Sequence, residues 1–204
     1  RLMCGLAAAD KGRTRVAGVD VDKDPLGARG KLGFLAQDTL LYPRHSVVET
    51  LMLFARLHNL DEPRVRAQTD LWMTRLQLEP LADRMVGTLS SGERQRANLA
   101  RALVHEPPVV ILDEPTTALD PETVDMLLRV IGELRAEGRA ILLCSHALAD
   151  AELVVDRAVF IHAGRTVAEG TLAEIKTQTG TPSLNAAFLH IVRSMKQAGA
   201  AVSS

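Results

Sequence analysis

The spacing of apolar residues changes several times along the chain, and each change marks the edge of a predicted element. Short apolar runs and alternating stretches predict strands. These strands lie at residues 13–21, 31–36, 109–112, 140–144, 158–162 and 165–168. The runs at 109–112 and 140–144 contain no polar residue, so we expect both strands to be buried on both faces of a sheet.

Apolar residues spaced three and four apart predict helices through much of the remaining chain. The predicted helices, including a helix end at the start of the chain, cover residues 1–8, 47–57, 61–76, 91–104, 121–136, 147–153, 171–178 and 184–196. Ser46 and Glu49 have the spacing of a capping box, which supports the second of these helices. Because strands alternate with helices, we expect an α/β fold with a parallel sheet.

Two carboxylates, Asp113 and Glu114, directly follow the apolar run at 109–112. Open α/β sheets bind ligands at the carboxyl ends of their strands. Carboxylates that are half-buried there carry a desolvation cost unless a cation or a hydrogen-bond donor meets them. Two interpretations stay open from the residues alone: the polar end of a strand, or part of a site for a metal and a phosphate.

Ser90 and Glu93 repeat the capping-box spacing at the start of the helix predicted from residue 91. The simple interpretation is a helix cap, which stabilises a helix by about 1 kcal/mol. The alternative is an anion site, because the N–H groups of a helix start point outward and the helix dipole favours negative charge there. Gly92 would let a phosphate approach the backbone.

Other polar residues at the ends of predicted elements also admit two interpretations. His146 follows a predicted strand and is either a histidine packed in the core or a donor to a phosphate. Gln37 follows another strand and is either a solvated loop residue or a ligand near a metal. Asp120 can cap the helix that follows it. Arg96 and Arg101 are expected to face solvent.

The composition fits an ordinary globular protein and narrows the classes of partner. The chain has 204 residues, of which 47% are apolar and 24% charged, and its formal net charge is −1. The balanced charge and the few aromatic residues give no indication of nucleic-acid binding. Cys4 and Cys144 lack metal-ligand spacing and are expected to be reduced, packed thiols in a cytosolic setting. No apolar stretch approaches the roughly 20 residues of a membrane-spanning helix, so we expect any membrane association to involve a partner.

Four segments, in their order along the chain, resemble the defining motifs of ABC-type ATPase domains. Leu89–Arg96 resembles the signature motif, Val109–Pro115 the Walker B motif, Ala118–Asp120 the D-loop and Ser145-His146 the H-loop. Gln37, after its strand, resembles the Q-loop glutamine. The resemblance extends over nearly the whole chain, and the joint order and spacing of these segments make it specific.

The resemblance implies one partial ABC ATPase domain with an α/β, P-loop NTPase (RecA-like) core and an inserted helical subdomain. Residues 1–44 and 107–170 would form the core, residues 45–106 the helical subdomain with the signature motif, and residues 171–204 C-terminal helices and a tail. The Walker A pattern G-x-x-x-x-G-K-[ST], whose backbone cradles phosphates, does not occur. We therefore expect a chain truncated at its amino terminus, before or within the helix that follows the P-loop, with the first strands absent.

The same resemblance makes ATP and Mg²⁺ the expected cofactors. Asp113 would hold Mg²⁺, which prefers oxygen ligands and keeps several waters. Glu114 would act as the general base for the attacking water. His146 would donate to the γ-phosphate, and Gln37 would contact Mg²⁺ or the attacking water.

The signature residues would serve a nucleotide held by a second ABC ATPase domain. Ser90, Ser91, Gly92 and Glu93 would meet the γ-phosphate of that nucleotide, and Asp120 would also reach across the dimer. Two of these positions depart from the usual pattern, because Ser91 replaces a glycine and Glu93 replaces a glutamine. The change at Ser91 puts the close approach of a phosphate to the backbone in doubt.

The function implied is that of the ATP-binding and ATP-hydrolysing subunit of an ABC transporter. Residues 41–42 and 183–192 resemble those of exporter-type ATPases, which implies an exporter. Such a subunit works with a second ABC ATPase domain and with transmembrane permease subunits, and lies in the cytoplasm on the inner face of the cell membrane. One alternative is a soluble ABC-type ATPase acting on nucleic acid or the ribosome. The other is a fragment or regulatory subunit without ATPase activity, which is what we expect of these 204 residues alone.

Overall fold

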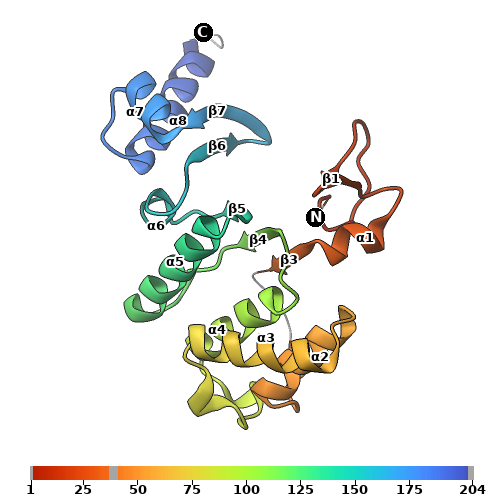
Figure 1. Cartoon of the computed structure of the whole chain (residues 1–204). Helices are drawn as coiled ribbons and strands as arrows, with labels where there is room; N and C mark the ends of the chain where they lie inside the picture. Colours follow the sequence, from red (N-terminus) through yellow and green to blue (C-terminus); the bar gives the residue numbers. More distant parts are fainter. Residues whose placement is uncertain (1, 37–40, 202–204) are drawn as a thin grey trace. The chain divides into compact units, whose positions relative to one another are not determined.

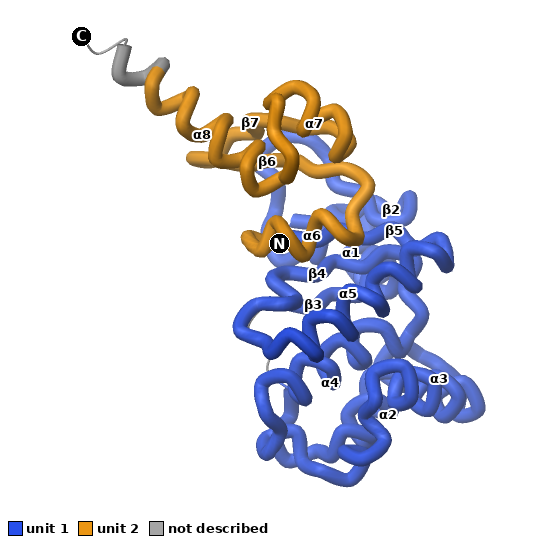
Figure 2. Tube along the Cα trace, turned by 90° about the vertical axis from the view of Figure 1, so that its left-hand side faces the viewer, with its two compact units in different colours: residues 1–144 blue, residues 145–204 orange. Residues whose placement is uncertain are grey.

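The computed structural model describes residues 2–36 and 41–201, with side chains described up to residue 197. It divides into two compact units, residues 1–144 and residues 145–204, which Figure 2 distinguishes by colour. The first unit contains the parallel sheet and most of the helices. The second contains a hairpin and three helices. Each unit is described by itself below.

The centre of the first unit is a parallel sheet with the strand order β3-β4-β5 (Figure 1). The strands are β3 (Leu32–Leu35), β4 (Val109–Asp113) and β5 (Ala140–Cys144). The register pairs Leu35 with Leu112 and Asp113 with Cys144. The predicted parallel sheet is thus confirmed, and its strands fall within one or two residues of the predicted positions.

The two apolar strands differ in their burial. Val110 and Leu112 of β4 are completely buried, as predicted for a strand covered on both faces. In β5, by contrast, half-buried and exposed residues alternate, and Leu142 is 43% exposed. The prediction that β5 is buried on both faces is therefore wrong. Within the described part of the sheet β5 is an edge strand that pairs with β4 on one side. The exposed positions Ala140, Leu142 and Cys144 share one face of the strand, so the expectation that Cys144 is a packed thiol is wrong.

The stretch predicted as one strand over residues 13–21 is instead a small hairpin. Strand β1 (Arg15–Val16) pairs antiparallel with β2 (Val19–Asp20). Between them Ala17 and Gly18 have φ values of 46° and 81°. Two consecutive residues with positive φ form the tight turn that suits a two-residue hairpin, and this turn breaks the strand that the valine alternation suggested.

Turns, and no helix, occupy the described residues at the start of the chain, so the predicted helix end is wrong there. Gly5 has a φ of 62°, and its N–H donates to the Leu2 carbonyl at 3.0 Å. Farther on, helix α1 (Pro25–Gly30) occupies most of the stretch between β2 and β3. Asp24 caps it by accepting a hydrogen bond from the Gly27 N–H at 2.8 Å, and Pro25 suits the first position of a helix.

The helices between β3 and β4 form an all-helical segment, here called the helical block. It comprises α2 (Val47–Leu57), α3 (Glu62–Arg75) and α4 (Ser91–Leu103), with short 3-10 turns η1 (Glu79–Leu81) and η2 (Val86–Thr88) between α3 and α4. Ser46 and Glu49 form the predicted capping box of α2, and Asp61 caps α3 by accepting from the Arg64 N–H at 3.0 Å. The predicted insertion of helices between two strands is confirmed.

Side chains of α4 hold the helical block to the outer edge of β3. The Arg101 guanidinium donates to the Phe34 carbonyl at 2.8 Å and lies over the Phe54 ring, 5.2 Å from its centroid. Burial lowers the pKa of Arg101 to about 10, which leaves it charged at neutral pH. Gly33 permits this approach, because a Cβ there would collide with the Ala102 carbonyl. The expectation that Arg101 faces solvent is wrong.

A pair of stacked histidines extends the same contact. The rings of His58 and His105 stack with centroids 3.6 Å apart, and His105 Nε2 lies 3.3 Å from the Leu32 carbonyl. Desolvation by burial, followed by the neighbouring His58, lowers the pKa of His105 to about 3. Burial likewise lowers the pKa of His58. Both rings are therefore neutral at physiological pH.

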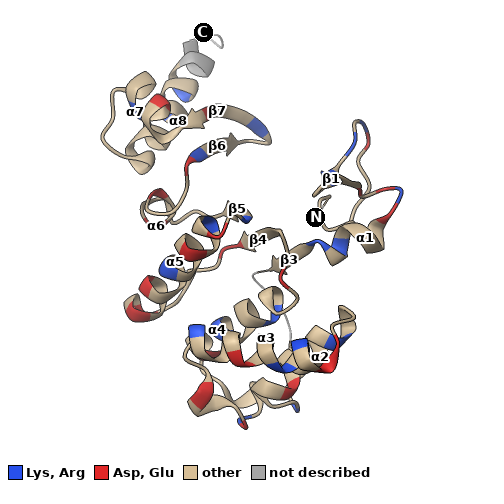
Figure 3. Cartoon of the chain, viewed as in Figure 1, with Lys and Arg blue, Asp and Glu red and all other residues tan. Residues whose placement is uncertain are grey.

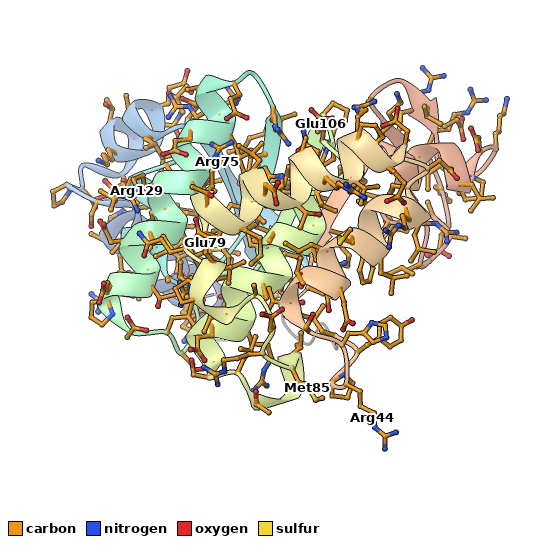
Figure 4. The ribbon with its side chains drawn as sticks, turned by 60° about the horizontal axis from the view of Figure 1, so that its bottom comes forward. Arg44, Arg75, Glu79, Met85, Glu106 and Arg129 are labelled. Atoms are coloured by element: carbon orange, nitrogen blue, oxygen red, sulfur yellow. The ribbon has the colours of Figure 1, made fainter. Side chains whose placement is uncertain are left out.

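Helix α5 (Pro121–Ala136) follows β4 as predicted. Gly138 ends it: its φ is 84°, and its N–H donates to the Arg135 carbonyl at 2.9 Å. Arg75 of α3 forms ion pairs with Glu133 at 2.7 Å and Glu137 at 2.8 Å near the end of α5, and Figure 4 labels Arg75 between these helices. Arg96 of α4 donates to the carbonyl of Leu76 at 3.1 Å, so the expectation that it faces solvent is wrong.

The second unit is built around a hairpin and two helices that cover it. Its elements are α6 (Leu148–Glu152), β6 (Arg157–His162), β7 (Arg165–Thr171), α7 (Leu172–Thr179) and α8 (Leu184–Ala201). The predicted hairpin turn at Ala163-Gly164 is confirmed, with positive φ at both residues. Phe160, Ile175 and Leu184 form the buried centre of this unit.

Charge and hydropathy show no large single-sign or membrane-spanning feature in the described residues. Basic and acidic side chains are mixed along α2 to α5 (Figure 3). None of the helices within residues 2–36 and 41–201 has the length and apolar character needed to cross a bilayer.

Candidate functional site

The sharp turn at the carboxyl end of β4 carries the two predicted carboxylates. Asp113 is the last residue of β4 and is half-buried. Glu114 has a φ of 51°, in the left-handed region that a residue with a side chain seldom adopts. Its N–H nevertheless donates to the Cys144 carbonyl at 2.8 Å, one step beyond the last paired residues of β4 and β5. Strained backbone of this kind costs about 1 to 3 kcal/mol and is concentrated at functional sites.

A threonine that the sequence analysis did not single out holds the Glu114 side chain. The Thr117 hydroxyl donates to Glu114 Oε2 at 2.9 Å. Ala118 then returns to the left-handed region with a φ of 59°. The signal available in the sequence was a hydroxyl three residues after a carboxylate, which is also common in ordinary turns, so it could not distinguish a side chain that orients Glu114.

The start of α4 has the predicted capping box. The Ser90 N–H donates to Glu93 Oε2 at 2.7 Å, and the Ser90 hydroxyl oxygen accepts from the Glu93 N–H at 3.3 Å. The backbone N–H of Ser90 lowers the pKa of Glu93, whose carboxylate also pairs with Arg84 at 3.1 Å. Ser90 and Ser91 are exposed. The Ser90 hydroxyl proton can still be donated, since the cap uses only its oxygen as an acceptor.

Gly92 and Asp120 bring the starts of α4 and α5 together. Gly92 is buried, and a Cβ at this position would lie 3.0 Å from Thr123 Oγ1 and 3.3 Å from Asp120 Oδ2. Asp120 caps α5 by accepting from the Thr123 N–H at 2.9 Å and from the Thr123 hydroxyl at 2.8 Å. These hydrogen bonds lower the pKa of Asp120. The capping interpretation of Asp120 is confirmed, and Gly92 has a packing role in addition to any role in anion binding.

The remaining two predicted residues are His146 and Gln37. His146 is exposed, two residues beyond β5 in the second unit, so the alternative of a histidine packed in the core is wrong. Gln37 lies outside the described residues. The structure thus places Asp113 and Glu114 on one turn and the signature residues beside Asp120, while His146 is connected to β5 through Ser145.

The donor set near Asp113 fits a cation that takes most of its ligands from water and phosphate. No group of three or more His, Cys, Asp and Glu side chains in the described parts of the chain is arranged to hold a metal. A protein cage for zinc or calcium is therefore absent from those residues. Mg²⁺ differs from these ions, because it keeps several waters and typically binds through one or two carboxylates and the phosphates of a nucleotide.

Similarity to known proteins identifies the family of this chain. The profile of the ABC transporter family matches residues 1–117. The daunorubicin resistance ATP-binding protein DrrA3 of Streptomyces coeruleorubidus is 36% identical over 99% of this chain and 63% of its own length. Nod factor export ATP-binding protein I of Paraburkholderia xenovorans is 37% identical over 83% of this chain and 56% of its own length.

A solved structure of an ATP-binding subunit of an ABC transporter superposes with a TM-score of 0.86 at 30% identity, covering 94% of this chain and 80% of its own. The chain therefore belongs to the ABC transporter family, as an ATP-binding domain with the α/β fold of P-loop NTPases. It spans less than two thirds of the length of the two curated relatives above.

Proposed function

We propose that this chain is the ATP-binding part of the ATP-hydrolysing subunit of an ABC transporter, which powers substrate movement through permease partners. The observation that carries the proposal is the position of Asp113 and Glu114, half-buried at the carboxyl end of the central parallel strand. Ligands of open α/β sheets bind at this edge. The left-handed backbone of Glu114 adds support, since such strain persists where a function requires it.

In the proposed site the residues of this chain divide the work of hydrolysis. Asp113 would hold Mg²⁺ through water, and Gln37 would contact the same ion or the attacking water. When bound, Mg²⁺ would neutralise part of the negative charge on the phosphates. Glu114 would orient the attacking water and accept its proton, and His146, which is exposed, would donate to the γ-phosphate.

The signature residues are proposed to complete the site of a second ABC ATPase domain. Ser90 and Ser91 are exposed at the start of α4, where the helix dipole favours an anion. The Ser90 hydroxyl would donate to the γ-phosphate of the partner's ATP. Gly92 and Glu93 would fix the shape of this helix start, and Asp120 would contact the partner from the neighbouring start of α5.

The permease partner is proposed to dock on the helical block. The docking end is formed by the loop before α2 and the loop before α4, which are joined by hydrogen bonds. The Val86 N–H donates to the His45 carbonyl at 2.9 Å and the Gly87 N–H to the Pro43 carbonyl at 3.0 Å. Tyr42 is 56% and Met85 54% exposed, and Arg44 and Met85 project from this end (Figure 4). A mixed apolar and basic surface suits a membrane subunit's cytoplasmic segment, which would hold the ATPase peripherally on the inner face of the membrane.

An exporter is the transporter type best supported. The names of the two curated relatives refer to drug resistance and to export, and this agrees with the exporter-like residues 183–192. The mixed charges of α2 to α5 (Figure 3) disfavour the alternative of an ABC-type ATPase acting on nucleic acid, because a basic patch would be expected there.

A second candidate is a regulatory chain that binds partners but does not hydrolyse ATP. The observation favouring it is that these 204 residues hold no Walker A pattern, and phosphoryl transfer in P-loop proteins depends on that loop and its lysine. On this view the residues present would supply a signature face to a partner domain.

The test uses an ATPase assembly that includes these residues and a phosphate-binding loop, with the 204 residues alone as the inactive comparison. Glu114→Gln is expected to lower kcat by about 100-fold or more while ATP binding is retained. Glu79→Gln, an exposed site on the helical block (Figure 4), should leave kcat unchanged. Full turnover by Glu114→Gln would show that Glu114 is not the general base. Turnover by the 204 residues alone would show that hydrolysis does not require a separate phosphate-binding loop.

A further inference from the structure

The turn that carries Glu114 is held from three directions. The Glu114 N–H donates to the Cys144 carbonyl of β5, and the Thr117 hydroxyl donates to Glu114 Oε2. The third contact comes from the helical block, where the side chain of Gln95 donates from Nε2 to the Pro115 carbonyl at 2.9 Å. Pro115 is buried, so this carbonyl has an interior position next to Glu114.

These contacts are needed because the turn is not a conformation that the chain would adopt by default. Glu114 and Ala118 both have positive φ. For residues with a Cβ this region costs about 1 to 2 kcal/mol each. Such a backbone persists only where its surroundings over-determine it. Hydrogen bonds to the Glu114 N–H, the Glu114 carboxylate and the Pro115 carbonyl provide that constraint around Glu114.

Gln95 lies on the first turns of α4, the same helix that begins with the signature residues. Gly92, one turn earlier, packs against Thr123 and Asp120 at the start of α5. The β4–α5 connection is thus attached to α4 at both of its ends, by Gln95 near Glu114 and by Gly92 near Asp120. A shift of the start of α4 would therefore displace the backbone beside Glu114.

We propose that Gln95 and Thr117 are positioning residues that fix the Glu114 carboxylate, and that Gln95 couples its position to the signature end of α4. The proposal rests on the proposed function of Glu114 as the general base. Neither residue contacts substrate in it: Thr117 orients the carboxylate directly, and Gln95 holds the peptide group that follows it.

Two substitutions, each with a matched control, test this in the same ATPase assembly. Thr117→Val keeps the shape but removes the hydroxyl, and Gln95→Glu keeps the length but places an oxygen against the Pro115 carbonyl. Each is expected to lower kcat by about 10-fold to 100-fold, the range for a misplaced catalytic group, with an unchanged KM for ATP. Thr117→Ser, which retains the hydroxyl, should restore most of kcat. Gln178→Glu and Thr177→Val, at exposed positions on α7, are the matched controls and should behave as the parent.

A second readout does not depend on turnover. Amide hydrogen exchange at Glu114 is expected to be at least about 10-fold faster in Gln95→Glu than in the parent, because the turn opens more readily. Unchanged kcat and unchanged exchange in Gln95→Glu and Thr117→Val would overturn the inference, provided that Glu114→Gln is inactive. If Glu114→Gln is active, the proposed function fails, and faster exchange in Gln95→Glu would then show a structural role alone.

Discussion

Gly92 at the start of α4 lies directly against Thr123 at the start of α5, so closely that a Cβ on Gly92 would be 3.0 Å from the Thr123 hydroxyl oxygen. The Thr123 side chain cannot turn away without losing the hydrogen bond from its hydroxyl to Asp120 Oδ2. The glycine of the signature sequence is therefore required by packing within the chain, whatever further part it has in binding a phosphate.

Gly92→Ala should accordingly destabilise the chain. An alanine gains up to about 1 kcal/mol of helix propensity, but overpacking against Thr123 and Asp120 costs about 1 to 3 kcal/mol. We expect a net loss of about 1 kcal/mol in the free energy of unfolding, measured by urea denaturation. The penalty should shrink in a Thr123→Ala background, where the hydroxyl and methyl groups are gone.

The control for this change is Gly132→Ala in the middle of α5, where a Cβ would meet nothing within 4 Å. That substitution should stabilise the chain by up to about 1 kcal/mol. Equal stabilisation by Gly92→Ala would contradict the packing role.

The stacked pair of His58 and His105 should make stability depend on pH. The pKa of His105 is lowered to about 3, below an unfolded value of about 6.5, so the unfolded chain binds more protons in this interval. The contribution of neutral His105 to the free energy of unfolding is fully present above pH 6.5 and is lost as the pH falls toward 3. For His105 alone the loss from pH 7 to pH 5 is about 2 kcal/mol, and the nearby cations Arg101 and Arg139 act in the same direction.

His105→Gln keeps a donor for the Leu32 carbonyl but cannot be protonated. It should reduce the loss of stability between pH 7 and pH 5, as followed by urea unfolding at both values. His190→Gln, at an exposed position on α8, should leave that loss as it is in the parent. An equal pH dependence in the His105→Gln variant and the parent would show that another group titrates.

Arg101→Met should measure how much the charged hydrogen bond from Arg101 to β3 contributes to the free energy of unfolding. Methionine keeps much of the contact with Phe54 but leaves the Phe34 carbonyl without the donor at 2.8 Å. Hydrogen bonds that involve a charged group contribute about 1.5 to 3 kcal/mol, so a loss of about 2 kcal/mol is expected in thermal or urea unfolding. Arg129→Met on the exposed face of α5 (Figure 4) should change stability by less than about 0.5 kcal/mol. Equal effects of the two substitutions would exclude a special role for Arg101.

Local patterns with a single physical cause could be predicted from the sequence. The capping boxes at Ser46 and Ser90, the helix that begins after Asp120 and the buried strand before Asp113 all appear where expected. In each case neighbours in sequence settle the outcome, because a cap needs residues three positions apart and a buried parallel strand needs a continuous apolar run.

Features that depend on residues distant in sequence could not be predicted in the same way. Arg101 was expected in solvent, yet it reaches a carbonyl 67 residues earlier in the chain. The exposure of β5 depends on what packs beside it, which its apolar sequence does not specify. Within the site, Gln95 looked like an ordinary polar helix residue, and its contact with Pro115 arises only when α4 packs against the β4–α5 connection.

The carbonyls of Leu32 and Phe34 lie on the margin of β3 that faces away from β4. Arg101 of α4 donates to the Phe34 carbonyl, and His105, two residues beyond α4, lies against the Leu32 carbonyl. An incoming backbone would have to displace these side chains, which protects the margin from unwanted strand addition of the kind that leads to aggregation. A further strand, including one from a separate peptide, would then pair with the outer edge of β5.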